Sequence, residues 1–251
     1  MNKTLENCYA RSLTFLGSTN PWPVRFEFEG NGILSPAEKD NPNFHDWTKI
    51  YVLYCDGAEH QGYRENPVVH KGKTIYFRGS RNTLEQFAYL DKKYDFYNQE
   101  KIVIAGSAIG GIAAYEWTQY LYEHTKTSKV YSLPDSGLAF MNYTSPLTKK
   151  ENLRRELSNL LNFVGQDENE LPTPVKMCHQ KIHDLPSCHD PSNIAEFIDA
   201  PMFIIQSPYD EWGIGYQVEA KCYSGPKSPY SLEHCNKTSL ADIEKYRETV
   251  V

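Results

Sequence analysis

A short glycine-rich run constrains this chain more than any other feature. The apolar segment 101–105 leads directly into Gly106-Ser-Ala-Ile-Gly-Gly111, a pattern typical of a nucleophile elbow, in which a strand turns sharply into a helix. Such a turn needs small residues two positions before its tip and two and three positions after it, because backbone segments approach closely there. With Ala108 at the tip, glycines occupy all three positions, whereas a tip at Ser107 would put the bulky Ile109 at one of them. We therefore expect the tip at Ala108, which has no nucleophilic side chain.

Two downstream segments match the other parts of such a site. The apolar run Pro201–Gln206 indicates a short strand, and Asp210 stands beyond its carboxyl end. His234 comes later in the chain. The order nucleophile position, acid, histidine is that of the α/β-hydrolases, in which a carboxylate after a late strand orients the histidine.

A wider set of motifs runs through nearly the whole chain. Together with the elbow, these are Leu16-Gly-Ser-Thr-Asn20, Gly32-Ile-Leu-Ser35, Asn41-Pro-Asn-Phe-His-Asp-Trp47, Tyr54-Cys-Asp-Gly57, Tyr76-Phe-Arg-Gly-Ser-Arg81, Asp135-Ser-Gly137, Tyr209-Asp-Glu-Trp212 and Glu233-His-Cys235. In this order they resemble the pectin acetylesterases and their animal relative Notum, a carboxylesterase family. The resemblance implies an α/β fold of the α/β-hydrolase type, with a mostly parallel sheet flanked by helices, in a single domain over residues 1–251.

The resemblance also assigns roles to individual residues. It puts the family's catalytic serine at Ala108, its aspartate at Asp210 and its histidine at His234, with the backbone N–H of Ile109 in the oxyanion hole. The chain departs from the family because it has no Gly-Gly-Gly-Trp-type oxyanion segment. We therefore expect this domain to lack the family's amino-terminal oxyanion strand, and its carboxyl-terminal end as well. Loss of one oxyanion donor lowers turnover by about 100 to 1,000-fold, and loss of the serine removes the nucleophile itself.

Composition argues against two classes of partner. The net charge of −6 and the scattered Lys and Arg residues argue against nucleic acid, which binds clustered basic residues. The longest apolar stretch, Ile102–Tyr115, is interrupted by Gly and Ser and is shorter than the roughly 20 residues that a membrane-spanning helix needs. Residues 1–20 contain no apolar core of the kind found in signal peptides. We expect no cofactor.

The six cysteines are even in number, which is consistent with disulfides. Pairing by neighbourhood joins Cys8 with Cys55, Cys178 with Cys188 and Cys222 with Cys235, although the sequence alone leaves other pairings open. The family has a pair just before the strand that leads to its aspartate, which favours Cys178–Cys188. The alternative is a metal site in the same window, formed by Cys178, His179, His183, Cys188 and His189. No familiar zinc spacing is matched, so we expect no metal.

The cellular location follows from the same pattern. Disulfides persist in oxidising compartments, and three Asn-X-Thr sequons, at Asn2, Asn142 and Asn236, agree with this setting. We therefore expect an extracellular protein or one of the secretory lumen.

Apolar and periodic segments predict alternating strands and helices. Buried parallel strands are predicted at Ile50–Tyr54, Thr74–Phe77, Ile102–Ala105, Val130–Leu133 and Phe203–Gln206. Helices are predicted at Thr83–Lys93 after a capping box, at Ile112–His124, along the apolar stripe Leu153–Val164, and at Ser239–Thr249 after a serine cap. The proline-rich stretch Leu171–Pro174 predicts a loop.

Two hypotheses about function follow. In the first, the chain is a catalytically inactive relative of the family that acts as a binding or structural assembly component, and another protein chain completes or covers an exposed sheet edge. In the second, it is a carboxylesterase that removes acetyl or acyl groups from a polysaccharide or protein by a Ser-His-Asp mechanism, with the serine of position 108 replaced or misrecorded in this sequence. Retention of Asp210 and His234 favours the second. The reduced oxyanion region favours the first, which we prefer, with an acylated glycan or protein as the ligand of any residual cleft.

Overall fold

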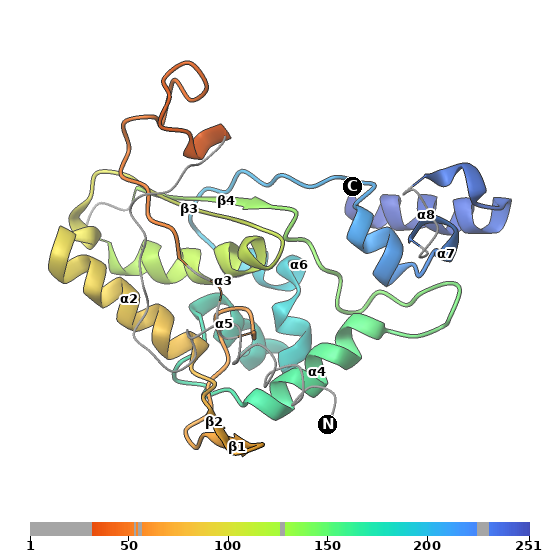
Figure 1. Ribbon diagram of the computed structural model, residues 1–251, viewed down its shortest axis with the longest axis horizontal. Helices are drawn as coiled ribbons and strands as arrows, with labels where there is room; N and C mark the ends of the chain where they lie inside the picture. Colours follow the sequence, from red (N-terminus) through yellow and green to blue (C-terminus); the bar gives the residue numbers. More distant parts are fainter. Residues whose placement is uncertain (1–31, 53, 55–56, 126–128, 225–230) are drawn as a thin grey trace.

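A parallel pair of strands lies at the centre of the molecule, with helices packed against it (Figure 1). The computed structural model describes residues 32–52, 54, 57–125, 129–224 and 231–251. The motif Leu16–Asn20 and the predicted bridge between Cys8 and Cys55 lie outside the described residues. Within them the chain has the predicted α/β fold.

The central strands are β3 (Ile102–Ser107) and β4 (Val130–Asp135), which pair in parallel along their whole lengths. The helix between them, α3 (Ile109–His124), packs along both strands. Both predicted strands are confirmed, and each extends further toward its carboxyl end than its apolar run indicates. The three elements form a strand–helix–strand unit whose first turn is the elbow.

The segment after Pro201 extends this sheet by parallel bridges. Met202 bridges Ser132, and Ile205 bridges Asp135. The prediction of a buried strand here is wrong, because Phe203 is 70% exposed and Ile205 is 44% exposed. The segment pairs with β4 along one side, and no described residue pairs with the backbone groups of its other side, as at a sheet edge.

A second helix completes the hydrophobic cluster on α3. This is α2 (Gly79–Tyr94), whose Phe87 ring packs edge-on against Trp117 of α3, with ring centroids 6.0 Å apart. The buried members of the cluster are Phe87, Ile102, Trp117, Leu121 and Val130. The cluster therefore fixes α2 and α3 to the first residues of the two central strands.

Two predicted helix starts are displaced. Helix α2 begins at Gly79, and the hydroxyl of Thr83 donates to the Gly79 carbonyl (3.0 Å) from within the helix. Helix α8 (Lys237–Val250) is capped by Asn236, whose side chain accepts from the N–H of Ser239 (2.9 Å). In both cases a Ser or Thr that resembles a cap lies inside the first turns, since the chain adopts helical geometry before reaching it.

Below α3 in Figure 1 lie α4 and α5. Helix α4 (Asn152–Val164) forms where the apolar stripe predicts it. The prediction of a loop at Leu171–Pro174 is wrong for its last two residues, because α5 (Thr173–Ile182) begins at Thr173. Proline is tolerated in a first helical turn, where its missing N–H would have no helical partner. A short turn, η4 (Leu185–His189), and α6 (Pro191–Ile194) follow.

A small hairpin lies at one end of the molecule. Strands β1 (Val68–His70) and β2 (Lys73–Ile75) pair antiparallel, and Lys71 and Gly72 between them both have positive φ, as a tight hairpin turn requires. The strand predicted at 74–77 thus forms in part, in a hairpin and not in the parallel sheet. In the segment predicted at 50–54, Tyr51 makes an isolated bridge that its described neighbours do not continue. The remaining short turns are η2 (Gly32–Leu34), η3 (Phe96–Asn98) and η5 (Ala195–Phe197).

The carboxyl-terminal elements form a separate hydrophobic cluster, to one side of the sheet in Figure 1. They are the π-helix η6 (Gly213–Gln217), α7 (Lys221–Ser224), η7 (Leu232–His234) and α8. Their buried side chains pack against Phe140 and Tyr143, which follow β4. None of the helices in the described ranges is long and apolar enough to cross a membrane.

Two disulfides join neighbouring elements of the described structure. Cys178 of α5 is bonded to Cys188 of η4, and Cys222 of α7 is bonded to Cys235 just beyond η7. Both pairings agree with the prediction. The alternative of a metal site with Cys178 and Cys188 as ligands is wrong, since their two sulfur atoms are bonded to each other.

Candidate active site

The turn between β3 and α3 has the geometry of an elbow with Ala108 at its tip. Ala108 has φ 53° and ψ −116°, a conformation that is strained for a residue with a side chain. Its N–H donates to the carbonyl of Asp135 (2.9 Å), so the tip is held against the end of β4. Ala108 is exposed. The sharp turn therefore presents a methyl group where a nucleophile would stand.

The glycines around the tip differ in what they permit. A Cβ on Gly106 would lie 2.1 Å from the carbonyl oxygen of Gly110, and a Cβ on Gly111 would lie 2.8 Å from the carbonyl oxygen of Asp135. A Cβ on Gly110 would meet nothing within 4 Å. The expected need for a small residue two positions after the tip is therefore wrong in this chain, because Gly110 contributes its backbone to the close approach and has free space for a side chain.

Ile109 is the residue assigned to the oxyanion hole. It is the first residue of α3, and the first N–H groups of a helix have no partner within the helix. This N–H lies beside the tip in sequence. Its role as an oxyanion donor stays a prediction.

Asp210 lies beyond the sheet-edge segment, where it begins the carboxyl-terminal cluster. Its carboxylate accepts from the N–H of Gly213 (2.6 Å), and its carbonyl accepts from the N–H of Ile214 (2.9 Å). Burial raises the pKa of the Tyr246 hydroxyl, and the nearby charge of Asp210 raises it further. Asp210 therefore stabilises the start of η6 as an anion at a helix amino terminus does.

His234 ends the turn η7 and is exposed. The next residue, Cys235, bonds to Cys222 and anchors the histidine to α7. In the part of the chain that the structure describes, no hydrogen bond or ion pair joins His234 to Asp210. The catalytic roles assigned to Ala108, Asp210 and His234 stay predictions.

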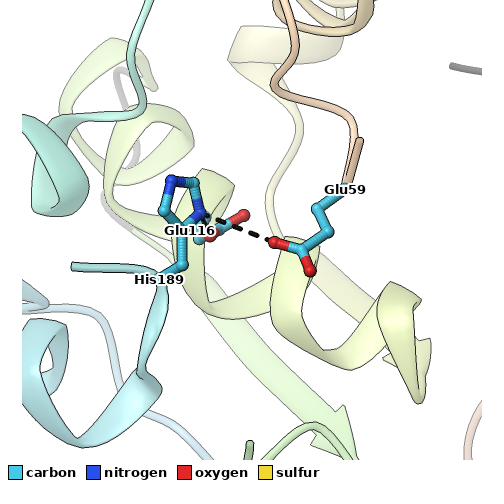
Figure 2. A group of neighbouring side chains, drawn as sticks. All are labelled: Glu59, Glu116 and His189. Carbon is cyan, nitrogen blue, oxygen red and sulfur yellow. Dashed lines mark hydrogen bonds and ion pairs between the residues drawn. The ribbon is translucent and has the colours of Figure 1, made fainter. Parts of the chain in front are cut away.

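A second group of polar side chains lies in the interior. Figure 2 shows Glu59 and Glu116 pointing toward the imidazole of His189. His189 Nδ1 lies 3.1 Å from Glu116 Oε1 and 3.5 Å from Glu59 Oε2. The side chains of His189 and Glu116 are 0% exposed, and that of Glu59 is 11% exposed. We call these three residues the interior cluster.

Two glutamine amides complete the surroundings of this histidine. Gln61 Nε2 lies 3.1 Å from His189 Nδ1, and Gln166 Nε2 lies 3.2 Å from His189 Nε2. The amide oxygens of both glutamines are buried and accept no hydrogen bond from the described residues. Each ring nitrogen therefore faces at least one polar group.

Electrostatics in the cluster favour bound positive charge. Burial raises the pKa of Glu116, and hydrogen bonding to His189 only partly offsets it. Burial lowers the pKa of His189, but hydrogen bonds and charges from Glu116 and Glu59 outweigh burial and raise it. Both groups hold protons more tightly than usual, Glu116 chiefly because it is removed from water and His189 because the two carboxylates stabilise its charged form.

Sequence reasoning missed this cluster. Its members lie on a turn, in the middle of α3 and at the end of η4, so no spacing motif connects them. The sequence does name His189 as a candidate ligand in the alternative metal window, and it shows Glu116 between the apolar stretch Ile102–Tyr115 and Trp117. A carboxylate inside such a helix is seldom fully buried unless it is paired.

Comparison with known proteins identifies the family. The sequence model of the pectinacetylesterase family matches residues 1–251. The chain belongs to the pectinacetylesterase family. Pectin acetylesterase 5 of Arabidopsis thaliana is 25% identical over 255 residues, which cover 99% of this chain and 57% of that protein. This family member therefore spans less than two thirds of that relative's length.

Animal relatives of this pectinacetylesterase-family chain match in sequence and in structure. Palmitoleoyl-protein carboxylesterase NOTUM of Schmidtea mediterranea is 35% identical over 81 residues, which cover 32% of this chain and 15% of that protein. The crystal structure of the Wnt deacylase Notum from Drosophila superposes with a TM-score of 0.69 at 18% identity, over 98% of this chain and 67% of that chain. The superposition shows a shared α/β-hydrolase-like fold. The relatives named here are esterases and a deacylase.

Proposed function

We propose that this member of the pectinacetylesterase family does not catalyse acyl transfer and acts as a binding or assembly component. The observation that carries the proposal is Ala108 at the tip of an intact elbow. A methyl group cannot attack a carbonyl, and Asp210 and His234 can activate a nucleophile but cannot replace one.

The contacts of Asp210 support the same conclusion. In a working triad the carboxylate accepts a hydrogen bond from the histidine and holds its ring in place. Here the carboxylate accepts from the N–H of Gly213 at 2.6 Å. Asp210 thus has a structural task at the start of η6 that would retain it in a chain without catalysis.

The alternative is a carboxylesterase that removes acetyl or acyl groups from a polysaccharide or protein, with its serine replaced at position 108. The named activities of the relatives favour it, as does the elbow itself, since Gly106 and Gly111 still permit the close approach that a nucleophile at the tip requires. The two candidates differ in what a serine at position 108 would do.

We expect a fluorophosphonate probe to leave the parent chain unlabelled and to label Ala108→Ser weakly. The restored hydroxyl would stand at an exposed tip, next to the N–H of Ile109, and would need His234 to lose its proton. Labelling is measured by intact-protein mass spectrometry after a fixed exposure.

Two control variants separate the sources of labelling. Ala108→Ser combined with Ser107→Ala tests whether the exposed neighbouring hydroxyl takes the probe, and Ala108→Ser combined with His234→Ala tests the histidine. Labelling of the parent would contradict the inactive assignment. A folded Ala108→Ser variant that takes no probe would remove the support for this placement of the three residues.

We also propose that another protein chain covers the sheet edge at Met202–Ile205. Phe203 is 70% exposed, Ile204 46% and Ile205 44%, and their segment continues the parallel sheet beside β4. Exposed apolar side chains on an edge segment favour pairing with a further strand. The occupant that fits is an extended polypeptide segment that adds a strand to this edge.

Without that partner, the isolated chain should self-associate. Size-exclusion chromatography with light scattering is expected to give a mass that rises with protein concentration. Phe203→Lys should reduce this association, because a charged side chain disfavours edge-to-edge pairing, while Lys245→Ala on α8 should not. A stable, monodisperse monomer of the parent chain at all concentrations would contradict the partner proposal.

The compartment is part of the same proposal. Two disulfides join elements of the described structure, and such bonds persist in oxidising surroundings. We place the protein outside the cell or in the secretory lumen.

A further inference from the structure

We propose that Glu59, Glu116 and His189 bind one divalent transition-metal ion, with Zn²⁺ as the best match, at a buried structural site. The inference does not depend on whether the elbow is catalytic. It concerns a different part of α3, because Glu116 lies about two helical turns beyond Ala108.

The spacing of the donor atoms fits a bound ion. Zn²⁺ binds imidazole nitrogen and carboxylate oxygen at about 2.0–2.2 Å, so two ligand atoms in a tetrahedral site stand roughly 3.4 Å apart. His189 Nδ1 lies 3.1 Å from Glu116 Oε1 and 3.5 Å from Glu59 Oε2. All three donor atoms lie within 4.8 Å of one another. Small side-chain rotations would bring them around one centre.

Unpartnered atoms point to a missing ligand. Glu116 is 0% exposed, yet its Oε2 has no hydrogen bond within the described structure, and the contact of Glu59 Oε2 with His189 Nδ1, at 3.5 Å, is a long one. A buried carboxylate oxygen without a partner is destabilising. An ion between the two carboxylates would give these oxygens a ligand contact.

The charges also match. Two ionised carboxylates and a neutral imidazole carry a total charge of −2, which a divalent cation neutralises. Charged groups in protein interiors are paired or coordinate a metal ion.

The two glutamines beside His189 fit two further roles at such a site. Gln61 could supply a fourth ligand, and Gln166 could hydrogen-bond the ring nitrogen of His189 that does not bind the ion. Rotating an amide by half a turn exchanges its oxygen and nitrogen, which coordinates seldom distinguish. Gln61 would then present its unpartnered oxygen beside His189 Nδ1, and Gln166 would accept a hydrogen bond from the Nε2–H of His189. A metal-bound imidazole ordinarily donates its other N–H in this way.

The three ligands come from separate parts of the fold. Glu59 lies on the turn before β1, Glu116 lies on α3, and His189 ends η4 next to the disulfide-bonded Cys188. One ion would tie the turn and the disulfide layer to the central helix. The burial of the cluster leaves no exposed face for a substrate, so we assign the ion a structural role.

The experiment uses the full chain, stripped with EDTA and then dialysed against Zn²⁺ alone. We expect one equivalent of zinc per chain by elemental mass spectrometry, together with a higher melting temperature. Glu116→Gln keeps the shape of the side chain but loses the charge, and should weaken zinc binding by about 100-fold or more, since even outer contacts to metal ligands are worth 10–100-fold. Glu59→Gln, on the turn before β1, should do the same if Glu116→Gln fails to fold.

The matched control is a second histidine–glutamate pair outside the cluster. His179 Nε2 lies 3.7 Å from Glu168 Oε1 at the surface, so His179→Gln should bind one equivalent of zinc like the parent. Replacing Zn²⁺ by Co²⁺ gives an absorption spectrum that reports the ligands directly. A parent chain that binds no zinc, or binds it as tightly after Glu59→Gln and Glu116→Gln, would overturn the proposal and leave a proton-sharing cluster.

Discussion

Gly106→Ala is expected to prevent the chain from folding, or to lower its free energy of unfolding by more than about 4 kcal/mol, at the upper end of single-residue effects. The added Cβ would lie 2.1 Å from the carbonyl oxygen and 2.3 Å from the carbonyl carbon of Gly110. Carbon atoms that are not bonded pack at about 3.5–4.0 Å. Both contacts are backbone atoms of a turn that is held between β3 and α3, so neither can move aside without opening the elbow.

Gly110→Ala is the matched control, four residues along the same turn. Its Cβ would meet nothing within 4 Å, and alanine in place of glycine inside a helix stabilises by roughly 0.5–1 kcal/mol. Urea unfolding followed by far-ultraviolet circular dichroism measures both variants. Similar free energies for the two would show that the turn is looser than its glycine contacts indicate.

Removal of the Cys178–Cys188 bond is expected to lower the free energy of unfolding by about 3 kcal/mol, the magnitude for a loop of this size in the chain-entropy description. The two cysteines are separated by 10 positions and are 1% and 0% exposed. Alanine is the replacement of choice, because a serine hydroxyl would be buried without a partner. Urea unfolding of Cys178→Ala with Cys188→Ala measures the loss.

The single variants and the intact protein supply the controls. Cys178→Ala alone should lose nearly as much stability as the double variant, because the first substitution already breaks the bond. Non-reducing mass spectrometry of the parent should find no free thiol at Cys178, Cys188, Cys222 or Cys235. Titratable thiols at these positions would place the protein in a reducing compartment and contradict the proposed location.

The sequence predicts the centre of the fold well because its signals there are local. A β-branched run followed by closely spaced glycines predicts β3, the elbow and α3, and the apolar stripe of α4 has a clear helical period. Helix α5 is not predicted, because its two prolines favour a loop. Pro172 precedes the helix and Pro174 lies in its first turn, where proline is tolerated. Local composition likewise cannot tell a buried strand from the exposed segment at Phe203, since burial depends on which elements lie beside it.

In the candidate site too, features set by local sequence are predicted and features set by distant contacts are not. The tip at Ala108 follows from glycine spacing, which reflects backbone contacts only a few residues apart. The contact between Asp210 and Gly213 depends on a π-helix that no sequence pattern indicates. The interior cluster joins three residues far apart in the chain, and such tertiary groupings leave no spacing motif.

The proposal of a family member without catalysis is tested most directly by hydrolysis of p-nitrophenyl acetate. The purified parent chain, His234→Ala and Ala108→Ser are compared with buffer at equal protein concentration. We predict that the parent and His234→Ala give the same rate as buffer, because neither has a nucleophile at the tip of the elbow. A rate for the parent that exceeds buffer and is lost in His234→Ala would show that this chain is an active esterase despite Ala108.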